Sequence, residues 1–264
     1  MKKKLAIILV AVTLVVALSI ALTSCNMIKG LIPGGDDGDE INISSDYDYS
    51  KIEENVNEMK TNGIYIEVKV TGESDDSAPT EEYYTYGAKG DIYYYSYGEE
   101  KDQTYYDLTS DEYYVTYTLE EENDELVWNK TITAYSEYMT KDQAQRAANL
   151  QGALVWSWFG YYANAGSGNG TKTTTTIAGR SCDKYEYNTN VAVVGAAASV
   201  KQIYCVDKET GVCLKYSVTG SAVSTDGSSS GSYAMECKKF QTNWTPELPT
   251  VDAAHTHDNT STND

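Results

Sequence analysis

The sequence predicts a mainly β protein of the α+β class, in which two helices cover one face of a large curved antiparallel sheet. Three observations support this prediction. Eleven short stretches alternate apolar and polar residues, as strands with one buried face do. Most of these stretches are separated by short acidic or glycine-bearing turns, a spacing typical of an antiparallel meander. Two further stretches carry apolar residues at helical spacing.

Residues 1–24 have the composition of an export signal, because Lys2, Lys3 and Lys4 precede an apolar run that ends at Leu22. An apolar run of this length is also long enough to remain in a bilayer as a spanning helix. The Leu-Thr-Ser-Cys that follows resembles the lipobox of bacterial lipoproteins. This resemblance implies diacylglycerol and palmitate-type acyl chains on Cys25 and cleavage after Ser24. A cysteine with several acyl chains would anchor the chain stably to the outer face of the bacterial cell membrane.

The next segment, residues 25–45, is predicted to be a flexible acidic linker, because it has glycines, Pro33 and no apolar periodicity. Its acidic cluster after Pro33 lacks the alternating ligands and final glutamate of a calcium loop. A single domain is expected over residues 46–245. The polar, aperiodic residues 246–264 are predicted to be a disordered tail.

The domain is expected to begin with a helix. Ile52, Val56 and Met59 follow helical spacing, Ser50 is a candidate N-terminal cap, and Asn62-Gly63 ends the pattern. Six strands are expected after this helix, near residues 64–73, 82–88, 91–97, 103–108, 112–120 and 125–133.

A second helix is expected from Thr140, which forms a capping-box pattern with Gln143. Its apolar side includes Ala144, Ala147, Leu154 and Trp158. Packing of this side against the sheet would bury the second helix more deeply than the first. Five strands then follow, near residues 171–178, 182–188, 200–206, 212–219 and 233–240.

The formal net charge of the chain is −19. Removal of residues 1–24 takes away three lysines and no acid, which leaves 17 basic residues, 39 acidic residues and a charge of −22. Such an excess repels nucleic acid and anionic headgroups, so no nucleic-acid partner is expected. About 200 residues are enough for one core, and a monomer is expected.

Four cysteines follow Cys25, namely Cys182, Cys205, Cys213 and Cys237. An even number in an exported chain predicts two disulfides, and four cysteines allow three pairings. Zinc binding would need close Cys-x-x-Cys pairs or nearby histidines, which are absent from this part of the sequence. A type I turn over residues 208–211, with strands paired as in a meander, favours the pairing of Cys182 with Cys205 and of Cys213 with Cys237.

Tyrosine accounts for 24 residues and phenylalanine for only two, and many of the tyrosines lie in the predicted strands. Tyrosine is a strong strand former with an apolar ring and a polar tip, which by itself explains much of this pattern. Alternatively, the rings line an open groove for a ligand. The candidate groove residues are Tyr93, Tyr95, Tyr113, Tyr117, Trp156 and Trp158.

No catalytic site is predicted, and the protein is not expected to be an enzyme. The only histidines, His255 and His257, lie in the tail, so a serine or cysteine nucleophile has no histidine base within the domain. Adjacent acidic residues lie at strand ends and turns, where they are solvated. No cofactor and no metal are expected.

The lipobox, the tyrosine-rich meander and the ending IAGRSCDKYEY…IYCVDKETGVCLKYSV together resemble a known family. The family consists of exported lipoproteins of Gram-positive anaerobes with a LolA/LppX-like (lipoprotein-carrier) half-barrel fold. The resemblance covers most of residues 46–240, and the ending carries its motif. It implies an incomplete barrel of about 10–11 strands with two helices packed on the concave face. It also implies binding of acyl chains or a related hydrophobic ligand, although the tyrosines and the acidic charge depart from the family's greasy cavity.

The function predicted from the sequence is therefore that of a membrane-anchored extracytoplasmic lipoprotein, non-enzymatic, that binds a hydrophobic or amphiphilic ligand. One alternative is a surface module that binds carbohydrate or protein through exposed tyrosine and tryptophan. Another is a structural or signalling ectodomain without a small ligand.

Overall fold

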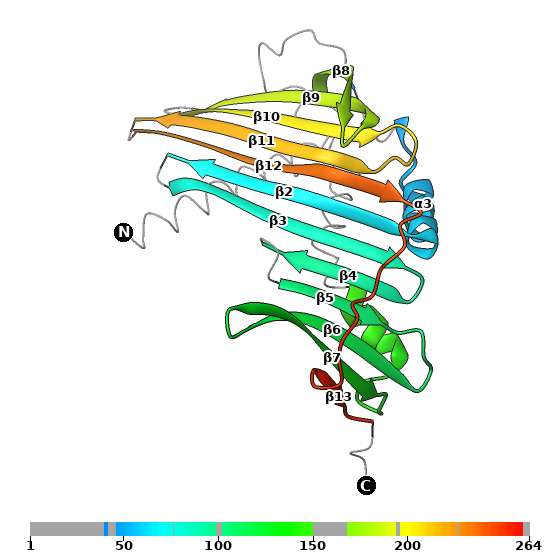
Figure 1. Ribbon diagram of the computed structural model, residues 1–264. Helices are drawn as coiled ribbons and strands as arrows, with labels where there is room; N and C mark the ends of the chain where they lie inside the picture. Colours follow the sequence, from blue (N-terminus) through cyan, green and yellow to red (C-terminus); the bar gives the residue numbers. More distant parts are fainter. Residues whose placement is uncertain are drawn as a thin grey trace.

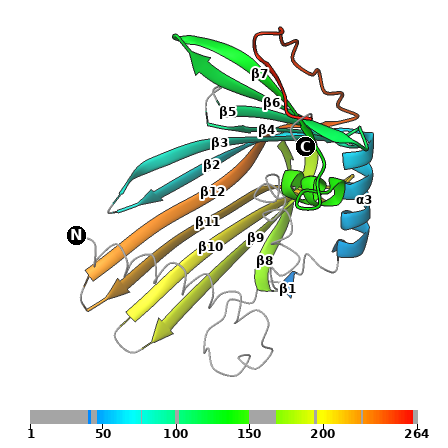
Figure 2. The same cartoon turned by 90° about the horizontal axis from the view of Figure 1, so that it is seen from below.

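The computed structural model describes residues 40–41, 46–75, 77–98, 102–149, 168–193, 196–225 and 227–260. Within these residues, 13 strands form one sheet in the order β1-β8-β9-β10-β11-β12-β2-β3-β4-β5-β6-β7-β13. Neighbouring strands are antiparallel, except that β13 pairs with β7 in parallel. The sheet is open and strongly curved (Figures 1 and 2), which confirms the predicted fold class.

The predicted strands all form, and two short strands at the ends of the sheet were not predicted. The strands are β1 Glu40–Ile41, β2 Ile64–Ser74, β3 Ser77–Lys89, β4 Ile92–Tyr97, β5 Asp102–Asp107, β6 Tyr113–Glu122, β7 Glu125–Ala134, β8 Gly168–Ile177, β9 Arg180–Val193, β10 Ala196–Asp207, β11 Cys213–Ser224, β12 Gly227–Thr242 and β13 Thr256–Asp258. Several hairpins extend well beyond their predicted ends. Small residues at their tips are largely exposed, so they give no alternating signal, yet the backbone ladder continues through them.

The first helix, α3 (Tyr49–Asn62), lies across one end of the sheet in Figure 1. Asn55 donates to the carbonyl of Thr210 in the β10–β11 turn, and the amide of Gly90 donates to the carbonyl of Lys60 at the other end of α3. The predicted cap was wrong by two residues. The Asp48 carboxylate, not the Ser50 hydroxyl, caps α3, and it accepts the amide of Ser50 at 3.0 Å.

The second helix is described over residues 141–149 and lies on the concave side of the sheet in Figure 2. Its predicted capping box is confirmed, because the Thr140 amide donates to the Gln143 side chain at 2.8 Å and the Gln143 amide donates to the Thr140 hydroxyl at 3.3 Å. Ala144 and Ala148 are buried in the core, whereas Ala147 is exposed, contrary to the prediction. The buried pair four residues apart marks the side that faces the sheet.

The core lies between the concave side of the sheet and the two helices. Its fully buried members include Ile64, Ile66, Tyr86 and Leu214. Near the edge of the sheet formed by β1 and β8, the sheet curls so that β8 also contacts β12. The tips of the long hairpins lie at the end of the sheet away from α3, where many residues are exposed (Figure 1).

The described domain is held at its N-terminal boundary. Asp46 accepts the Tyr185 hydroxyl at 2.7 Å and pairs with Lys172 at 3.1 Å. The Tyr47 hydroxyl donates to Asp183 at 3.1 Å. Within the predicted linker, Glu40–Ile41 pairs with β8. The leader and Cys25 lie outside the described residues.

The tail was predicted to be disordered, and this prediction was wrong for residues 246–260. The tail crosses the sheet from the end of β12 to β7, where it adds β13 (Figure 1). The exposed edge of β7 offers unpaired backbone groups, and the tail satisfies part of that edge. Composition alone could not reveal this, because the pairing involves backbone atoms. None of the helices in the described ranges has the length and apolar character that a bilayer crossing requires.

Candidate functional site

The strand register assigns most tyrosines of the sheet to its concave side. Residues opposite each other on neighbouring strands, and residues two apart on one strand, share a face. Tyr185, Tyr204, Tyr216 and Met235 form one such row across β9 to β12. We use the name concave tyrosine face for the set Tyr84, Tyr86, Tyr93, Tyr95, Tyr97, Tyr106, Tyr185, Tyr187, Tyr204, Tyr216 and Tyr233.

The rings of this face contact one another in two groups. On β9 to β12, the ring centroids of Tyr187 and Tyr204 are 6.1 Å apart, those of Tyr204 and Tyr216 are 5.0 Å apart, and those of Tyr216 and Tyr233 are 6.4 Å apart. On β3 to β5, the pairs Tyr84–Tyr97, Tyr86–Tyr95 and Tyr95–Tyr106 have separations of 5.1, 5.6 and 5.9 Å. The tilted and edge-on geometries of these pairs are favourable for aromatic side chains.

The rings of the concave tyrosine face differ in solvent exposure, and we call the buried ones inner rings and the partly buried or exposed ones outer rings. Tyr86 is fully buried and Tyr204 is 4% exposed, whereas Tyr216 and Tyr233 are partly buried and Tyr97 is 50% exposed. The inner rings therefore belong to the core, and the outer rings present an aromatic surface to solvent. This surface can contact the apolar part of a ligand and offer hydroxyl groups to its polar part.

Three hydroxyls of the concave tyrosine face are uncharged at neutral pH. Burial raises the pKa of Tyr93, Tyr106 and Tyr204 above the ordinary value for tyrosine. Each hydroxyl therefore keeps its proton and can act as a hydrogen-bond donor as well as an acceptor. Carboxylates also lie beside this face, since the Tyr84 hydroxyl donates to Glu82 at 2.6 Å and the Tyr185 hydroxyl donates to Asp46 at 2.7 Å.

The predicted groove residues that the structure describes lie on two different faces of the sheet. Tyr93 and Tyr95 lie on the concave tyrosine face, but Tyr117 lies opposite Tyr105 and therefore on the convex side, and Tyr113 shares that side. Trp156 and Trp158 lie outside the described residues. The error arose because β4 to β6 carry rings on both faces, so alternation does not distinguish inside from outside. Tyr114 lies on the concave side, and its ring centroid is 5.6 Å from that of Tyr135.

The four cysteines of β9 to β12 are buried free thiols, so the predicted disulfides are absent. The predicted pairing also fails on register. Cys182 lies opposite Asp207, and Cys205 lies opposite Lys184 on one side and Lys215 on the other. A bulge at the end of the β10–β11 ladder shifts the pairing by one residue, which the sequence does not show.

Burial raises the pKa of the Cys182 and Cys205 thiols to about 11 and that of Cys237 to about 12. The thiolate is the reactive form, so native thiols should resist iodoacetamide at pH 8. In urea without reductant, a chain that starts at residue 26 should gain four adducts, as measured by mass spectrometry. Fewer than four adducts would contradict the free thiols, since a disulfide blocks alkylation.

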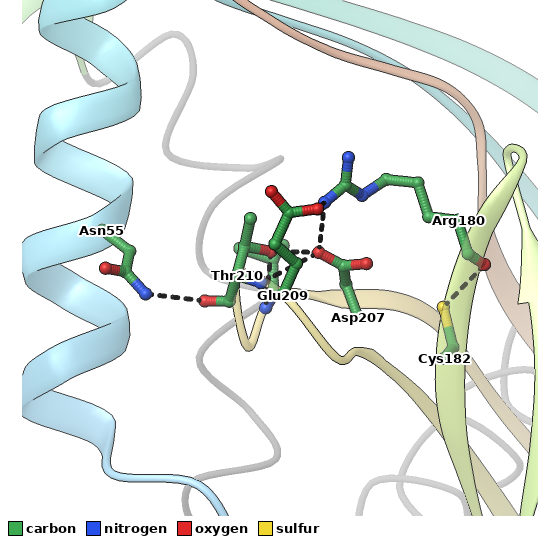
Figure 3. A network of polar contacts seen from close by, with 7 residues as sticks. Asn55, Arg180, Cys182, Asp207, Glu209 and Thr210 are labelled. Atoms are coloured by element: carbon green, nitrogen blue, oxygen red, sulfur yellow. Dashed lines mark hydrogen bonds and ion pairs between the residues drawn. The ribbon is translucent and has the colours of Figure 1, made fainter.

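The turn between β10 and β11 holds a buried polar network, shown in Figure 3. The Asp207 carboxylate accepts the Arg180 guanidinium at 2.8 Å, the Thr210 hydroxyl at 2.6 Å and the Thr210 amide at 3.0 Å. Gly211 has a φ of +75°, in the left-handed region that favours glycine. Glu209 adds an exposed contact to Arg180 at 2.9 Å. The network connects the start of β9 and the end of β10 to the turn. Because α3 also contacts this turn through Asn55, we assign the network a structural role.

The histidine region is ordered. The His255 ring contacts the Asp252 carboxylate at 2.8 Å and lies 3.7 Å from Glu122. Hydrogen bonding to Asp252 raises the pKa of His255. No group of three or more potential metal ligands occurs within the part of the chain that the structure describes.

No family model matches the sequence. No curated protein matches it either. Among solved structures, the chain is similar to the crystal structure of the LolA superfamily protein NE2245 from Nitrosomonas europaea. The two are 10% identical, the match covers 76% of this chain and 94% of that chain, and the TM-score is 0.24. At these values the family suggested by the sequence stays a prediction.

Proposed function

We propose that this protein is a lipoprotein anchored through Cys25 to the outer face of the membrane, and that its concave tyrosine face binds a hydrophobic or amphiphilic ligand. The proposed role is non-enzymatic and requires no cofactor. The observation that carries the proposal is the continuous contact of Tyr187, Tyr204, Tyr216 and Tyr233 across four strands, with the outer rings only partly buried.

The two sides of the long hairpins differ in the way that this proposal requires. On the concave side, Val200 lies opposite Gly220, which lies opposite Gly231, and Ala198 lies opposite Ala222. The alternate positions, which face the other way, carry mostly serine, threonine, asparagine and lysine. A smooth apolar strip therefore continues from the concave tyrosine face toward the hairpin tips.

The chemistry of this surface favours a ligand with both apolar and polar parts. Burial of apolar area contributes about 25 cal/mol per Å², so contact with several rings and the adjoining strip can hold an elongated apolar group. A tyrosine hydroxyl can form hydrogen bonds with hydroxyl, ester or phosphate groups, and it adds no repulsive charge of its own. A lipid with a polar headgroup meets both requirements.

The test is native mass spectrometry of the chain from residue 26 onward, secreted by bacteria and purified without detergent. We expect a copurified lipid of defined mass. The double variant Tyr216→Ser with Tyr233→Ser should lose most of it, because both rings contact each other on the concave side. The control Tyr113→Ser changes a ring that is 38% exposed on the convex side and should retain the lipid.

A wild-type chain without lipid, even after incubation with bacterial lipid extract, would contradict the proposal. Retention of an oligosaccharide in place of a lipid would instead support the alternative of a carbohydrate-binding module.

A further inference from the structure

The convex side of the sheet carries a second aromatic surface, which we call the convex aromatic cluster and which consists of Tyr65, Tyr94, Tyr105 and Trp128. The strand register places Tyr65 and Tyr94 on either side of Gly87, and Tyr105 opposite Tyr94. Ring centroids are 4.5 Å apart for Tyr94 and Tyr105 and 5.7 Å apart for Tyr105 and Trp128.

Trp244, the first aromatic residue after β12, fills a slot in this cluster. Its ring lies 5.6 Å from that of Tyr65 and 6.4 Å from that of Tyr94. Gly87 forms the floor of the slot, since a Cβ there would lie 2.7 Å from the Trp244 ring. At Gly63, a Cβ would lie 1.9 Å from the Trp244 carbonyl oxygen, and the Gly63 carbonyl accepts the Trp244 amide at 3.2 Å. Two glycines thus leave room for one residue, Gly63 for the backbone of Trp244 and Gly87 for its ring.

Beyond Trp244 the tail remains docked as an extended segment. Pro246, Leu248, Pro249 and Val251 are partly buried, whereas the residues between them, such as Glu247, are exposed. The tail ends as β13 on the edge of β7, with the His255 carbonyl accepting the Lys130 amide at 2.9 Å. Figures 1 and 2 show this path outside the curved sheet, on the side opposite the helix at residues 141–149.

The docked segment has the features of a peptide ligand. Pro246 and Pro249 have the spacing of a P-x-x-P motif, and aromatic surfaces bind such segments because proline preorganises the extended chain. The addition of a strand at a free sheet edge is another common mode of peptide binding. The tail joins the sheet through Asn243, whose φ is +60°, directly after the end of β12. This single connection allows the tail to leave its site without disturbing the antiparallel ladder.

We propose that the convex aromatic cluster and the edge of β7 form a recognition site for an extended, proline-containing peptide with a tryptophan anchor. The chain's own tail occupies the site in cis, and the tail of a second copy occupies it in trans. The second copy is the partner that fits, because its tail carries the same tryptophan, prolines and edge strand that the site receives here. The proposal does not depend on ligand binding by the concave tyrosine face.

The cis tail should outcompete a free peptide. A short tether gives an effective concentration in the millimolar range, so an intact tail weakens the binding of an added peptide by about 100-fold or more. A chain whose tail lacks the Trp244 side chain should leave the recognition site open to an added peptide. Trp244→Ala serves this purpose, because it removes the anchor and leaves Gly87 and the convex aromatic cluster unchanged.

The test is fluorescence anisotropy with a labelled synthetic peptide of residues 243–260 and the full chain. We expect the peptide to bind the Trp244→Ala chain at least about 100-fold more tightly than the wild-type chain. Binding should disappear when Gly87→Ala is added, since the new methyl group occupies the slot for the peptide's tryptophan. A peptide whose own tryptophan is alanine should not bind either chain.

Circular dichroism establishes that each chain is folded. If Trp244→Ala is not folded, the chain with Pro246→Gly and Pro249→Gly, which loosens the tail and keeps the sheet intact, takes its place with the same expected gain over wild type. Equal peptide binding with and without Gly87→Ala, or no binding to a folded chain with a loosened tail, would overturn the proposal.

Discussion

Asp207→Ala is expected to lower the free energy of unfolding by about 3–5 kcal/mol, the range for breaking a buried ion pair from one side. The Asp207 side chain is 2% exposed and the Arg180 side chain is 18% exposed. Removal of the carboxylate leaves the guanidinium short of its buried partner and also leaves the Thr210 hydroxyl and amide without their acceptor. Urea unfolding followed by circular dichroism measures the loss.

The matched control is Glu209→Ala, which removes the other carboxylate that contacts Arg180. Glu209 is 82% exposed, so its loss should cost less than about 1 kcal/mol. Similar losses for the two variants would show that the buried network does not hold the β10–β11 turn in place.

Gly63→Ala is the second substitution with a large expected effect. Gly63 has a φ of +116°, which costs an alanine about 1–3 kcal/mol of backbone strain. The added methyl group would also displace the Trp244 backbone, and loss of most of the packing of a tryptophan costs about 3–5 kcal/mol. We expect a total loss of more than about 4 kcal/mol in the free energy of unfolding.

Gly179→Ala provides the control for Gly63→Ala. Gly179 also has a positive φ, +76°, but a methyl group there would meet nothing within 4 Å. Its cost should therefore be limited to about 1–2 kcal/mol of strain. If both substitutions cost the same in a thermal unfolding experiment, Trp244 does not pack against Gly63 as described.

The long elements and their order could be predicted from the sequence, whereas the short strands β1 and β13 could not. Strand alternation and the turns between strands identified every long strand, and the capping box at Thr140 identified the start of the second helix. These signals are local, because they depend on periodicity and on contacts within four residues. At α3, by contrast, Asp48 and Ser50 are both suitable caps, and composition does not decide between them.

The candidate site was predictable only in part, because its geometry depends on strand register. Tyr93 and Tyr95 lie on the concave side, whereas Tyr113 and Tyr117 lie on the convex side, since neighbouring strands carry tyrosine on both faces. The same dependence explains the failed cysteine pairing, because the β9–β10 register places Cys182 opposite Asp207 and a bulge shifts Cys213 at the end of the β10–β11 ladder.

The convex aromatic cluster was missed because the tail covers it. Polar composition indicated disorder, yet the tail's backbone pairs with β7 and its prolines dock between exposed residues. One signal in the sequence was available, the proline pair that follows Trp244. The proline pair indicates a docked segment only together with Gly63 and Gly87, whose contacts with Trp244 the sequence does not reveal.

We expect the ligand to bind on the concave tyrosine face and not on the convex aromatic cluster. Photocrosslinking with a diazirine-labelled long-chain fatty acid, followed by peptide mapping, tests it most directly. We predict adducts on β4, β11 and β12 at or beside Tyr97, Tyr216 and Tyr233, with competition by unlabelled lipid. Adducts confined to Tyr65, Tyr105 or the tail, or none at all on the folded chain, would contradict the claim.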